Sequence, residues 1–429
     1  MKRTLAEWLE WQEQLHLSSI DLGLDRVGEA ANRLQVTTLS MPVITVAGTN
    51  GKGSCVAMLD SIYRTANYQT GCYTSPHLIH YNERICIGGK PASDADICEA
   101  FVAIDKARES ISLTYFEFGT LAAAYLFRKY DVDVAIFEVG LGGRLDAVNL
   151  WDADIALISN IDIDHIDWLG DDREQIGVEK AGIMRNGHPI ICGDPTPTNS
   201  IKQEADRIGA QLLQLGKDFS WKPSDSAAES QSPQWLYQLN NTDPITLPLP
   251  ALRGRFQLNN ASAVVSLVQT FQNTLAVSDD EIARGLQSAN VIGRLQKLGE
   301  SPEILADVAH NPQSAAALAD FLTETPAQGK TIALFSALAD KDLAGIIGPL
   351  ADKFDSWHLI PLEGPRARTP QQLSQNLRDL GITAPIEIHS DINSTLITLQ
   401  NMLNYKDRVV AFGSFLVVSG VMHSLREAE

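Results

Sequence analysis

A glycine-rich segment with a single lysine is the strongest chemical signal in the sequence. Its glycines allow backbone N–H groups to turn inward around phosphate oxygens, and a helix that follows would add partial positive charge. Lys52 would contact the β- and γ-phosphates, and Ser54 would offer its hydroxyl to Mg²⁺. A plain strand-to-helix turn is the alternative, because Gly53 separates Lys52 from Ser54, unlike the usual phosphate loop. The segment lies between an apolar run and a helix-like stretch and reads Gly48-Thr49-Asn50-Gly51-Lys52-Gly53-Ser54.

Ionisable residues follow the next two apolar runs. Glu138 ends the first and precedes a glycine-rich turn in which Arg144 and Asp146 could contact a second substrate. Asp164 and His165 follow the second run. Parallel strands place such residues at one edge of a sheet, where they can hold Mg²⁺ facing a nucleotide. A solvated Glu138 and a structural His165 are the alternatives.

The elements that would position these residues follow the pattern of a parallel α/β sheet. Apolar runs alternate with longer helix-like stretches. Residues 216–250 predict a small excursion of antiparallel strands. The alternation then resumes, so we expect two α/β domains: an N-terminal parallel-sheet, ATPase-like domain over residues 1–297, and a smaller Rossmann-like domain over residues 298–429. The apolar runs cover residues 42–46, 132–137, 154–158, 189–192, 304–308, 331–335, 358–360 and 408–412.

Composition and charge argue against some classes of partner and indicate a cellular compartment. The formal net charge of -19 argues against nucleic acid or an anionic membrane surface as a partner. No apolar run approaches the roughly 20 residues of a membrane span. Thr4 and Glu7 predict a capping box that opens an amphipathic helix rather than a signal peptide. The 5 cysteines form no CxxC pair, which favours buried thiols in a reducing, cytoplasmic compartment.

Taken together, these segments resemble the bacterial folylpolyglutamate synthase/dihydrofolate synthase family, which is itself similar to the Mur peptide ligases. Each motif alone is weak, but their order along nearly the whole chain is specific. They cover residues 20–26, the loop 48–54, and then residues 74–78, 83–85, 114–117, 138–146, 164–165, 179–182, 293–294, 307–312 and 413–415.

The resemblance implies roles that local patterns do not give. Lys180, which on chemistry alone would be a surface lysine, would be carbamylated and so become an anion that binds a second Mg²⁺. The catalytic residues would be Lys52, Glu138, His165 and Lys180. The metal ligands would be Ser54, Ser75, Glu138, His165 and Lys180 as its carbamate. Substrate contacts would come from Thr114, Tyr115, Phe116, Glu117, Arg144, Leu145 and Asp146.

ATP contacts beyond the loop are implied at Arg294, Asp307 and His310, and at an asparagine. Related ligases carry a histidine-led motif before that asparagine, whereas this chain reads Arg255-Phe256-Gln257-Leu258-Asn259-Asn260. The contact is therefore assigned to Asn260, with Asn259 left open.

The expected activity is an ATP- and Mg²⁺-dependent ligation of L-glutamate to dihydropteroate and to folates through an acyl phosphate. The resemblance implies two magnesium ions, allows a monovalent cation such as K⁺, and suggests a monomer. The alternatives are a folylpolyglutamate synthase alone, a Mur-type peptide ligase, a P-loop kinase or GTPase, and a nucleotide-binding module without enzymatic activity.

Overall fold

The computed structural model describes residues 3–18, 20–224, 233–364 and 366–427. The chain divides into two compact units. The first comprises Met1–Ala251 and Gln257–Asn290, and the second comprises Leu252–Phe256 and Val291–Glu429. The sequence-based boundary between 297 and 298 falls inside a strand of the second unit, β12 (Gln296–Glu300).

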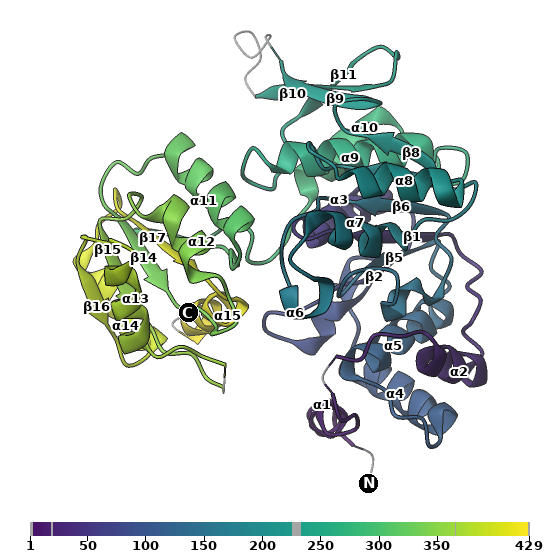
Figure 1. Cartoon of the computed structure of the whole chain (residues 1–429), viewed down its shortest axis with the longest axis horizontal. Coiled ribbons are helices and arrows are strands. Elements are labelled where there is room, and N and C mark those ends of the chain that lie inside the picture. The colour runs from purple at the N-terminus through teal and green to yellow at the C-terminus, as the bar shows by residue number, and fades with distance from the viewer. Residues whose placement is uncertain (1–2, 19, 225–232, 365, 428–429) are drawn as a thin grey trace. The chain divides into compact units, whose positions relative to one another are not determined.

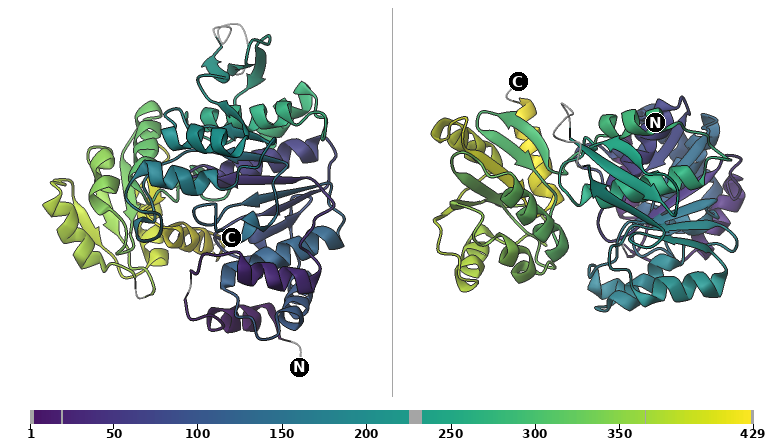
Figure 2. Two further views of the ribbon diagram at one scale, coloured as in Figure 1. Left: turned by 45° about the vertical axis from the view of Figure 1, so that its right-hand side comes forward. Right: turned by 90° about the horizontal axis from the view of Figure 1, so that it is seen from above.

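An eight-stranded sheet forms the centre of the first unit, with helices on both of its faces (Figures 1 and 2). Its order is β4-β3-β2-β5-β1-β6-β7-β8, parallel except where β3 pairs with β2 and β4. The strands are β1 (Val43–Ala47), β2 (Thr70–Tyr73), β3 (Ile85–Ile87), β4 (Lys90–Pro91), β5 (Val134–Glu138), β6 (Ile155–Ile158), β7 (Pro189–Cys192) and β8 (Gln211–Gln214). All residues of β1, β5 and β6 are buried, as expected of central strands covered on both faces.

The handedness of the crossover connections determines which face of the sheet each helix of this unit covers. The step from β1 to β2 runs in the opposite direction along the sheet from the steps β6 to β7 and β7 to β8, so right-handed crossovers place α3 on the opposite face from α7 and α8. The helices are α1 (Leu5–Glu13), α2 (Asp25–Leu34), α3 (Lys52–Thr65), α4 (Asp94–Arg108), α5 (Tyr115–Lys129), α6 (Ile166–Leu169), α7 (Arg173–Ala181), α8 (Asn199–Ile208), α9 (Gln257–Thr270) and α10 (Asp279–Ser288), with short 3-10 turns η1 (Tyr81–Arg84) and η2 (Ala147–Leu150).

Two local predictions are confirmed in this unit. Thr4 caps α1 through a capping box with Glu7. The segment 216–250 contains an antiparallel three-stranded sheet of β9 (Phe219–Pro223), β10 (Gln234–Leu239) and β11 (Ile245–Pro248), which packs against α9 (Figure 1). Its anchors are Trp235 and Tyr237, which are fully buried.

The second unit contains a six-stranded sheet in the order β12-β13-β17-β14-β15-β16, parallel except for the β12–β13 pair. The predicted apolar runs after residue 298 all form strands of this sheet. The elements after β12 are β13 (Glu303–Ala306), α11 (Pro312–Glu324), β14 (Thr331–Phe335), α12 (Leu343–Ile347), η4 (Gly348–Leu350), β15 (Ser356–Leu359), α13 (Pro370–Asp379), β16 (Ile386–Ile388), α14 (Ile392–Met402), β17 (Arg408–Phe412) and α15 (Phe415–Glu427).

A short piece of chain before α9 belongs to this second unit. Arg253 forms an ion pair with Glu303, with 3.6 Å between the guanidinium and carboxylate groups. Phe256 packs against the second unit's apolar core. The two-domain α/β fold expected from the sequence is confirmed. All 5 cysteines are free, and among the described residues no helix is long and apolar enough to cross a membrane.

Candidate active site

The glycine-rich loop joins the carboxyl end of β1 to the N-terminus of α3. Gly51 precedes the helix with φ 84°, a conformation that favours glycine. Gly48 has φ 150°, and a Cβ atom there would lie 1.9 Å from the Ser159 hydroxyl oxygen. Both positions therefore require glycine, one for its backbone conformation and one also for the space that it leaves.

The end of β6 supports this loop. The Asn50 N–H donates to the Asn160 side-chain oxygen at 2.8 Å, and the Ser159 hydroxyl donates to the Asn50 carbonyl at 2.5 Å. The Thr49 N–H donates to the Asn160 carbonyl at 3.0 Å. These three hydrogen bonds therefore fix the loop backbone at Thr49 and Asn50.

Lys52 lies over the loop that precedes it. Its ammonium donates to the carbonyls of Gly48 at 2.9 Å and Thr49 at 3.1 Å. A lysine ammonium held over a glycine-rich loop at a helix N-terminus is the arrangement that binds the terminal phosphates of a nucleotide.

Glu138 ends β5, the neighbour of β1, and is buried. Its carboxylate accepts the Ser75 N–H at 3.1 Å, and a Cβ atom at Gly53 would lie 3.9 Å from it. The predicted ligands Ser75 and Glu138 therefore lie together beside the start of α3. The Glu138 carboxylate and the Ser75 hydroxyl are oxygen donors of the kind that Mg²⁺ prefers.

The N-terminus of α9 completes the surroundings of the loop. The Gln257 side-chain amide donates to the Ser54 hydroxyl oxygen at 3.2 Å and accepts from the Asn260 amide at 2.9 Å. Asn260 faces Gly51, whose Cβ position would lie 2.7 Å from its side-chain oxygen. Asn259 instead accepts from the Trp221 indole N–H at 2.8 Å, so of the two asparagines it is Asn260 that faces the phosphate loop.

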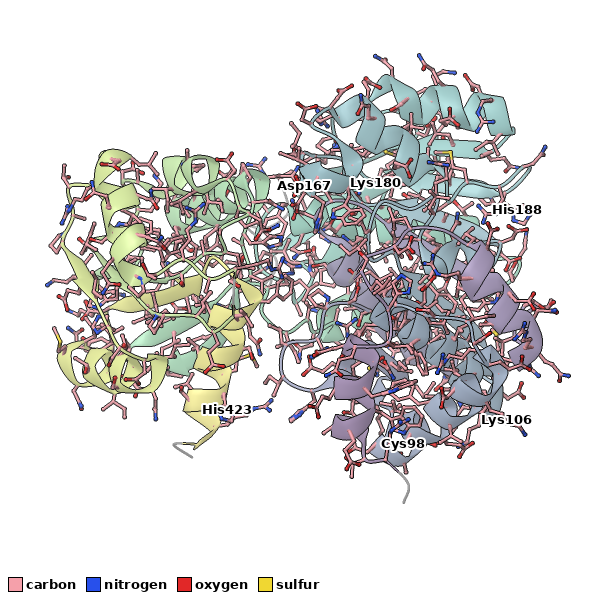
Figure 3. All side chains as sticks on the ribbon, turned by 60° about the horizontal axis from the view of Figure 1, so that its bottom comes forward. Cys98, Lys106, Asp167, Lys180, His188 and His423 are labelled. Atoms are coloured by element: carbon pink, nitrogen blue, oxygen red, sulfur yellow. The ribbon has the colours of Figure 1, made fainter. Side chains whose placement is uncertain are left out.

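Lys180 is a buried residue near the end of α7, not the surface lysine that its local sequence suggests (Figure 3). Burial, followed by repulsion from Lys52, lowers its pKa to about 7, and the attraction of Asp164 only partly opposes this. A large share of this lysine is therefore a neutral amine near pH 7, the form that reacts with carbon dioxide.

His165 immediately precedes α6, with an exposed side chain and φ 54°. Its backbone N–H donates to the Asp164 carboxylate at 2.8 Å. Asp164 in turn lies close enough to Lys180 to act on its pKa. The structure thus places these residues at the β6 end of the same sheet edge as the loop.

The turn after Glu138 is built around Asp146. Its buried carboxylate accepts the N–H groups of Leu141 at 2.9 Å and Val148 at 3.0 Å, and burial raises its pKa to about 6. Arg144 is exposed and pairs with Glu179 at 2.7 Å, while the Leu145 carbonyl accepts the Gly23 N–H at 3.1 Å. Asp146 shapes the turn, and Arg144 is the exposed member of this set.

The segment 114–117 also contains both structural residues and residues that are partly exposed. Thr114 and Glu117 form the capping box of α5, and buried Glu117 also pairs with Arg26 at 3.0 Å. Tyr115 and Phe116 are half-buried. The Arg84 guanidinium lies 5.4 Å from the centre of the Tyr115 ring, which places an aromatic and cationic surface beside this segment.

The predicted ATP contacts of the second unit gather where β13 ends. Asp307 is buried and accepts the N–H groups of Leu295 and Ala309, each at 2.8 Å. Burial raises its pKa, partly offset by the charge of Arg294. Arg294 and His310 both lie against the Phe415 ring, at 5.9 Å and 5.6 Å from its centre. The three predicted residues are therefore together within this unit.

Comparison with known proteins decides the family. Residues 46–268 match the Mur ligase middle domain, and residues 293–415 match the Mur ligase glutamate ligase domain. The chain belongs to the Mur ligase family.

Its relatives within the Mur ligases are folate enzymes by name. The dihydrofolate synthase/folylpolyglutamate synthase of Escherichia coli strain K12 is 43% identical over 373 residues, which is 87% of this chain and 85% of that protein. The protein of the same name from Mycobacterium tuberculosis is 33% identical and matches 83% of this chain and 77% of its own.

Solved structures give the same picture. FolC of E. coli in complex with DHPP and ADP has a TM-score of 0.92 and 39% identity, covering 99% of this chain and 98% of its own. The bifunctional folylpolyglutamate synthase/dihydrofolate synthase of Yersinia pestis complexed with AMPPNP and a Mn ion has a TM-score of 0.90, again with 39% identity and coverage of 99% and 98%.

Sequence reasoning missed several residues that shape the site of this Mur ligase. Ser159 and Asn160, which support the phosphate loop, end a strand without a recognisable motif. Gln257 bridges Ser54 and Asn260, and its only signal was its place in the segment 255–260, where related ligases carry a histidine-led motif. Arg84 lies in a segment whose only signal was the family resemblance.

Proposed function

We propose that this chain is an ATP-dependent ligase that adds L-glutamate to dihydropteroate, giving dihydrofolate, and to folates, giving polyglutamates. The observation that carries the proposal is the grouping of the Lys52 loop, Glu138 and buried Lys180 at one edge of a Mur ligase sheet. The names of the relatives specify the acid and the amino acid. The free cysteines favour a cytoplasmic setting.

The reaction would pass the γ-phosphate of ATP to the substrate carboxylate, and the glutamate amino group would displace phosphate from the acyl phosphate. Lys52 would offset the charge gathered between triphosphate and carboxylate, and the loop amides would fix the phosphates in line. Residues 1–297 would bind ATP, with Arg294 near the end of this range. Residues 298–429 would supply further nucleotide contacts through Asp307 and His310. Thr114 to Glu117, with Arg144, Leu145 and Asp146, would border the pterin acid.

Magnesium fits the oxygen donors of this site, which are Ser54, Ser75 and Glu138. These residues and the His165 imidazole nitrogen would hold it, and when bound it would neutralise charge on the phosphates. Lys180 would serve a second ion as its carbamate, because a neutral buried amine is poised to take up carbon dioxide.

The deciding experiment measures inorganic phosphate released from ATP with dihydropteroate and glutamate, each alone and both together. We expect release only with both. Equal release without glutamate would refute a ligase. Replacing dihydropteroate with a tetrahydrofolate, again with glutamate present, tests the second activity. Turnover with the folate but not with dihydropteroate would indicate a folylpolyglutamate synthase alone.

Two variants test the assigned residues. Lys52→Ala should abolish turnover in a folded protein, whereas Lys202→Ala, a change at an exposed residue of α8, should not. Lys180→Ala should also lose turnover and regain part of it with a short carboxylate such as acetate, which would replace the carbamate. Full activity in either site variant would remove that residue from the mechanism.

A further inference from the structure

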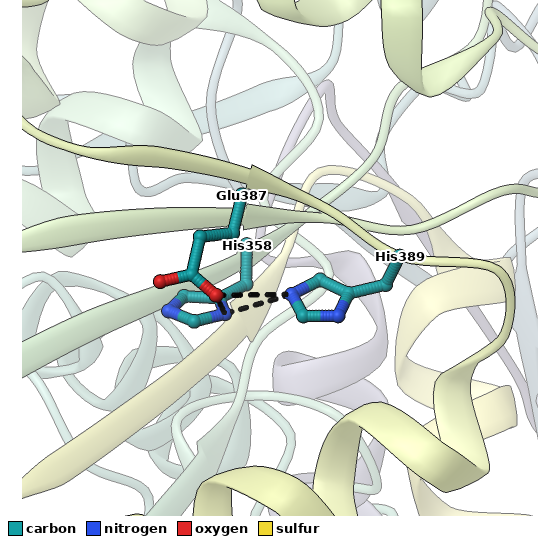
Figure 4. Close-up of side chains that lie close together, drawn as sticks. All are labelled: His358, Glu387 and His389. Carbon is teal, nitrogen blue, oxygen red and sulfur yellow. Dashed lines mark hydrogen bonds and ion pairs between the residues drawn. The ribbon is translucent and has the colours of Figure 1, made fainter.

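Three metal-ligating side chains meet at the edge of the second unit's sheet, and they share no residue with the candidate active site. β15 and β16 are parallel, and His358 lies opposite Glu387 in their register. Glu387 and His389 are two residues apart, so an extended backbone directs them to the same face of the sheet. Figure 4 shows the three side chains turned toward one another.

Their ligand atoms converge on one point. His358 Nδ1 lies 2.9 Å from His389 Nε2, and the Glu387 carboxylate oxygen lies 3.8 Å and 4.0 Å from these two atoms. Ligands at about 2.0–2.1 Å around a tetrahedral cation are roughly 3.3 Å apart. The three separations lie on both sides of that value, and Glu387, with 52% of its side chain exposed, has room to move inward.

The contact with Ser356 and the burial of the ring both favour His358 as a metal ligand. The Ser356 hydroxyl lies 3.1 Å from its Nε2 atom, so a proton on Nε2 leaves the Nδ1 lone pair facing the cluster. A hydrogen bond to the second ring nitrogen is the usual support of a metal-binding histidine. Burial also lowers the pKa of His358, which keeps the ring in the neutral form that binds metals.

A histidine–histidine hydrogen bond explains only part of this arrangement. One shared proton satisfies the two nitrogens at 2.9 Å, but the Glu387 oxygen lies beyond hydrogen-bond distance of both. A cation between the three atoms would use both lone pairs and the carboxylate charge at once.

We propose that His358, Glu387 and His389 form a binding site for a divalent late transition metal of the zinc type. Two imidazoles and a carboxylate favour zinc over the magnesium used in the reaction, and solvent at the exposed side supplies the fourth position. The metal would tie the edge strand β16 to β15.

The test is equilibrium dialysis of the metal-free full-length protein against Zn²⁺, with Mg²⁺ and ADP in excess to occupy the nucleotide site. We expect one tightly bound equivalent in the wild type. His389→Ala and Glu387→Gln should each weaken it by at least about tenfold. His423→Ala, a change at an exposed histidine of α15 in the same unit (Figure 3), should bind as the wild type does.

Two further readouts define the site. Co²⁺ in the same site should give the visible absorption of a tetrahedral ion, and His389→Ala should abolish it. Both variants change exposed or partly exposed side chains, so folding and ligase activity should remain. Equal Zn²⁺ binding by the wild type and His389→Ala, or no binding in the presence of Mg²⁺ and ADP, would overturn the proposal.

Discussion

Replacing Lys180 with methionine should inactivate the protein and yet stabilise it. Methionine keeps an unbranched apolar side chain, one heavy atom shorter than that of lysine, but removes the charge that burial disfavours. In carbon dioxide-free buffer without nucleotide, the wild type must either bury an ammonium or release its proton. Either choice costs free energy of folding that the variant avoids.

The size and sign of the effect follow from the pKa of Lys180, which falls from its ordinary value of 10.5 to about 7 in the folded protein. Between these values the unfolded chain binds a proton that the folded chain lacks, so the wild type becomes more stable as pH rises through that window. The shift costs the wild type about 4 kcal/mol near pH 7 and about 2 kcal/mol near pH 9. The advantage of the variant should shrink accordingly.

Urea unfolding followed by tryptophan fluorescence measures this difference. The sequence has 7 tryptophans, and all except Trp357 lie in the first unit, so the signal reports the unit that contains Lys180. Lys217→Met, a change at an exposed residue, is the matched control and should alter stability little at either pH.

A variant that is no more stable than the wild type near pH 7 would refute the reasoning. The same conclusion would follow if the gain were equal near pH 7 and near pH 9, because the pH dependence belongs to the proton and not to packing.

Other predictions concern the phosphate loop. Gly48→Ala should lower kcat/KM by about 100-fold or more, since its methyl group would push against Ser159 and displace the loop; unchanged steady-state kinetics would show that the loop tolerates the shift. Asn260→Ala should weaken ADP binding measured by calorimetry, whereas Asn259→Ala should chiefly loosen the contact with Trp221 and leave ADP affinity nearly unchanged. The reverse order of effects would reassign the nucleotide contact to Asn259.

Eight of the strands with parallel neighbours could be predicted because burial makes them continuous apolar runs. β2 and β8 were missed, because β2 reads Thr70-Gly71-Cys72-Tyr73 and β8 begins and ends with glutamine. β16 could not be predicted either, because it is a three-residue edge strand, Ile386-Glu387-Ile388, with little of it buried. The excursion at 216–250 could be predicted in kind from its Trp and Tyr pattern, but its packing on α9 depends on residues distant in sequence.

The site was predictable where chemistry requires special residue types and not where packing decides. Glycines and Lys52 indicate a phosphate loop, and Glu138 is recognisable because it ends a strand. The burial of Lys180 has no local signal, because only the tertiary fold encloses it. Asp146 and Glu117 show the converse: each has the chemistry of a ligand contact, and each is used mainly to hold a turn or a helix N-terminus.

The assignment of residues 252–256 to the second unit has a practical consequence for anyone who wishes to study the halves alone. The backbone changes unit after Ala251, again after Phe256 and a third time after Asn290. Dividing the gene after codon 290 would therefore give a first fragment that carries Arg253 and Phe256 without the second-unit residues that they contact. The second fragment would lack Arg253 and Phe256. Separate expression should succeed only if those five codons are replaced by a polar linker in the first fragment and grafted onto the second.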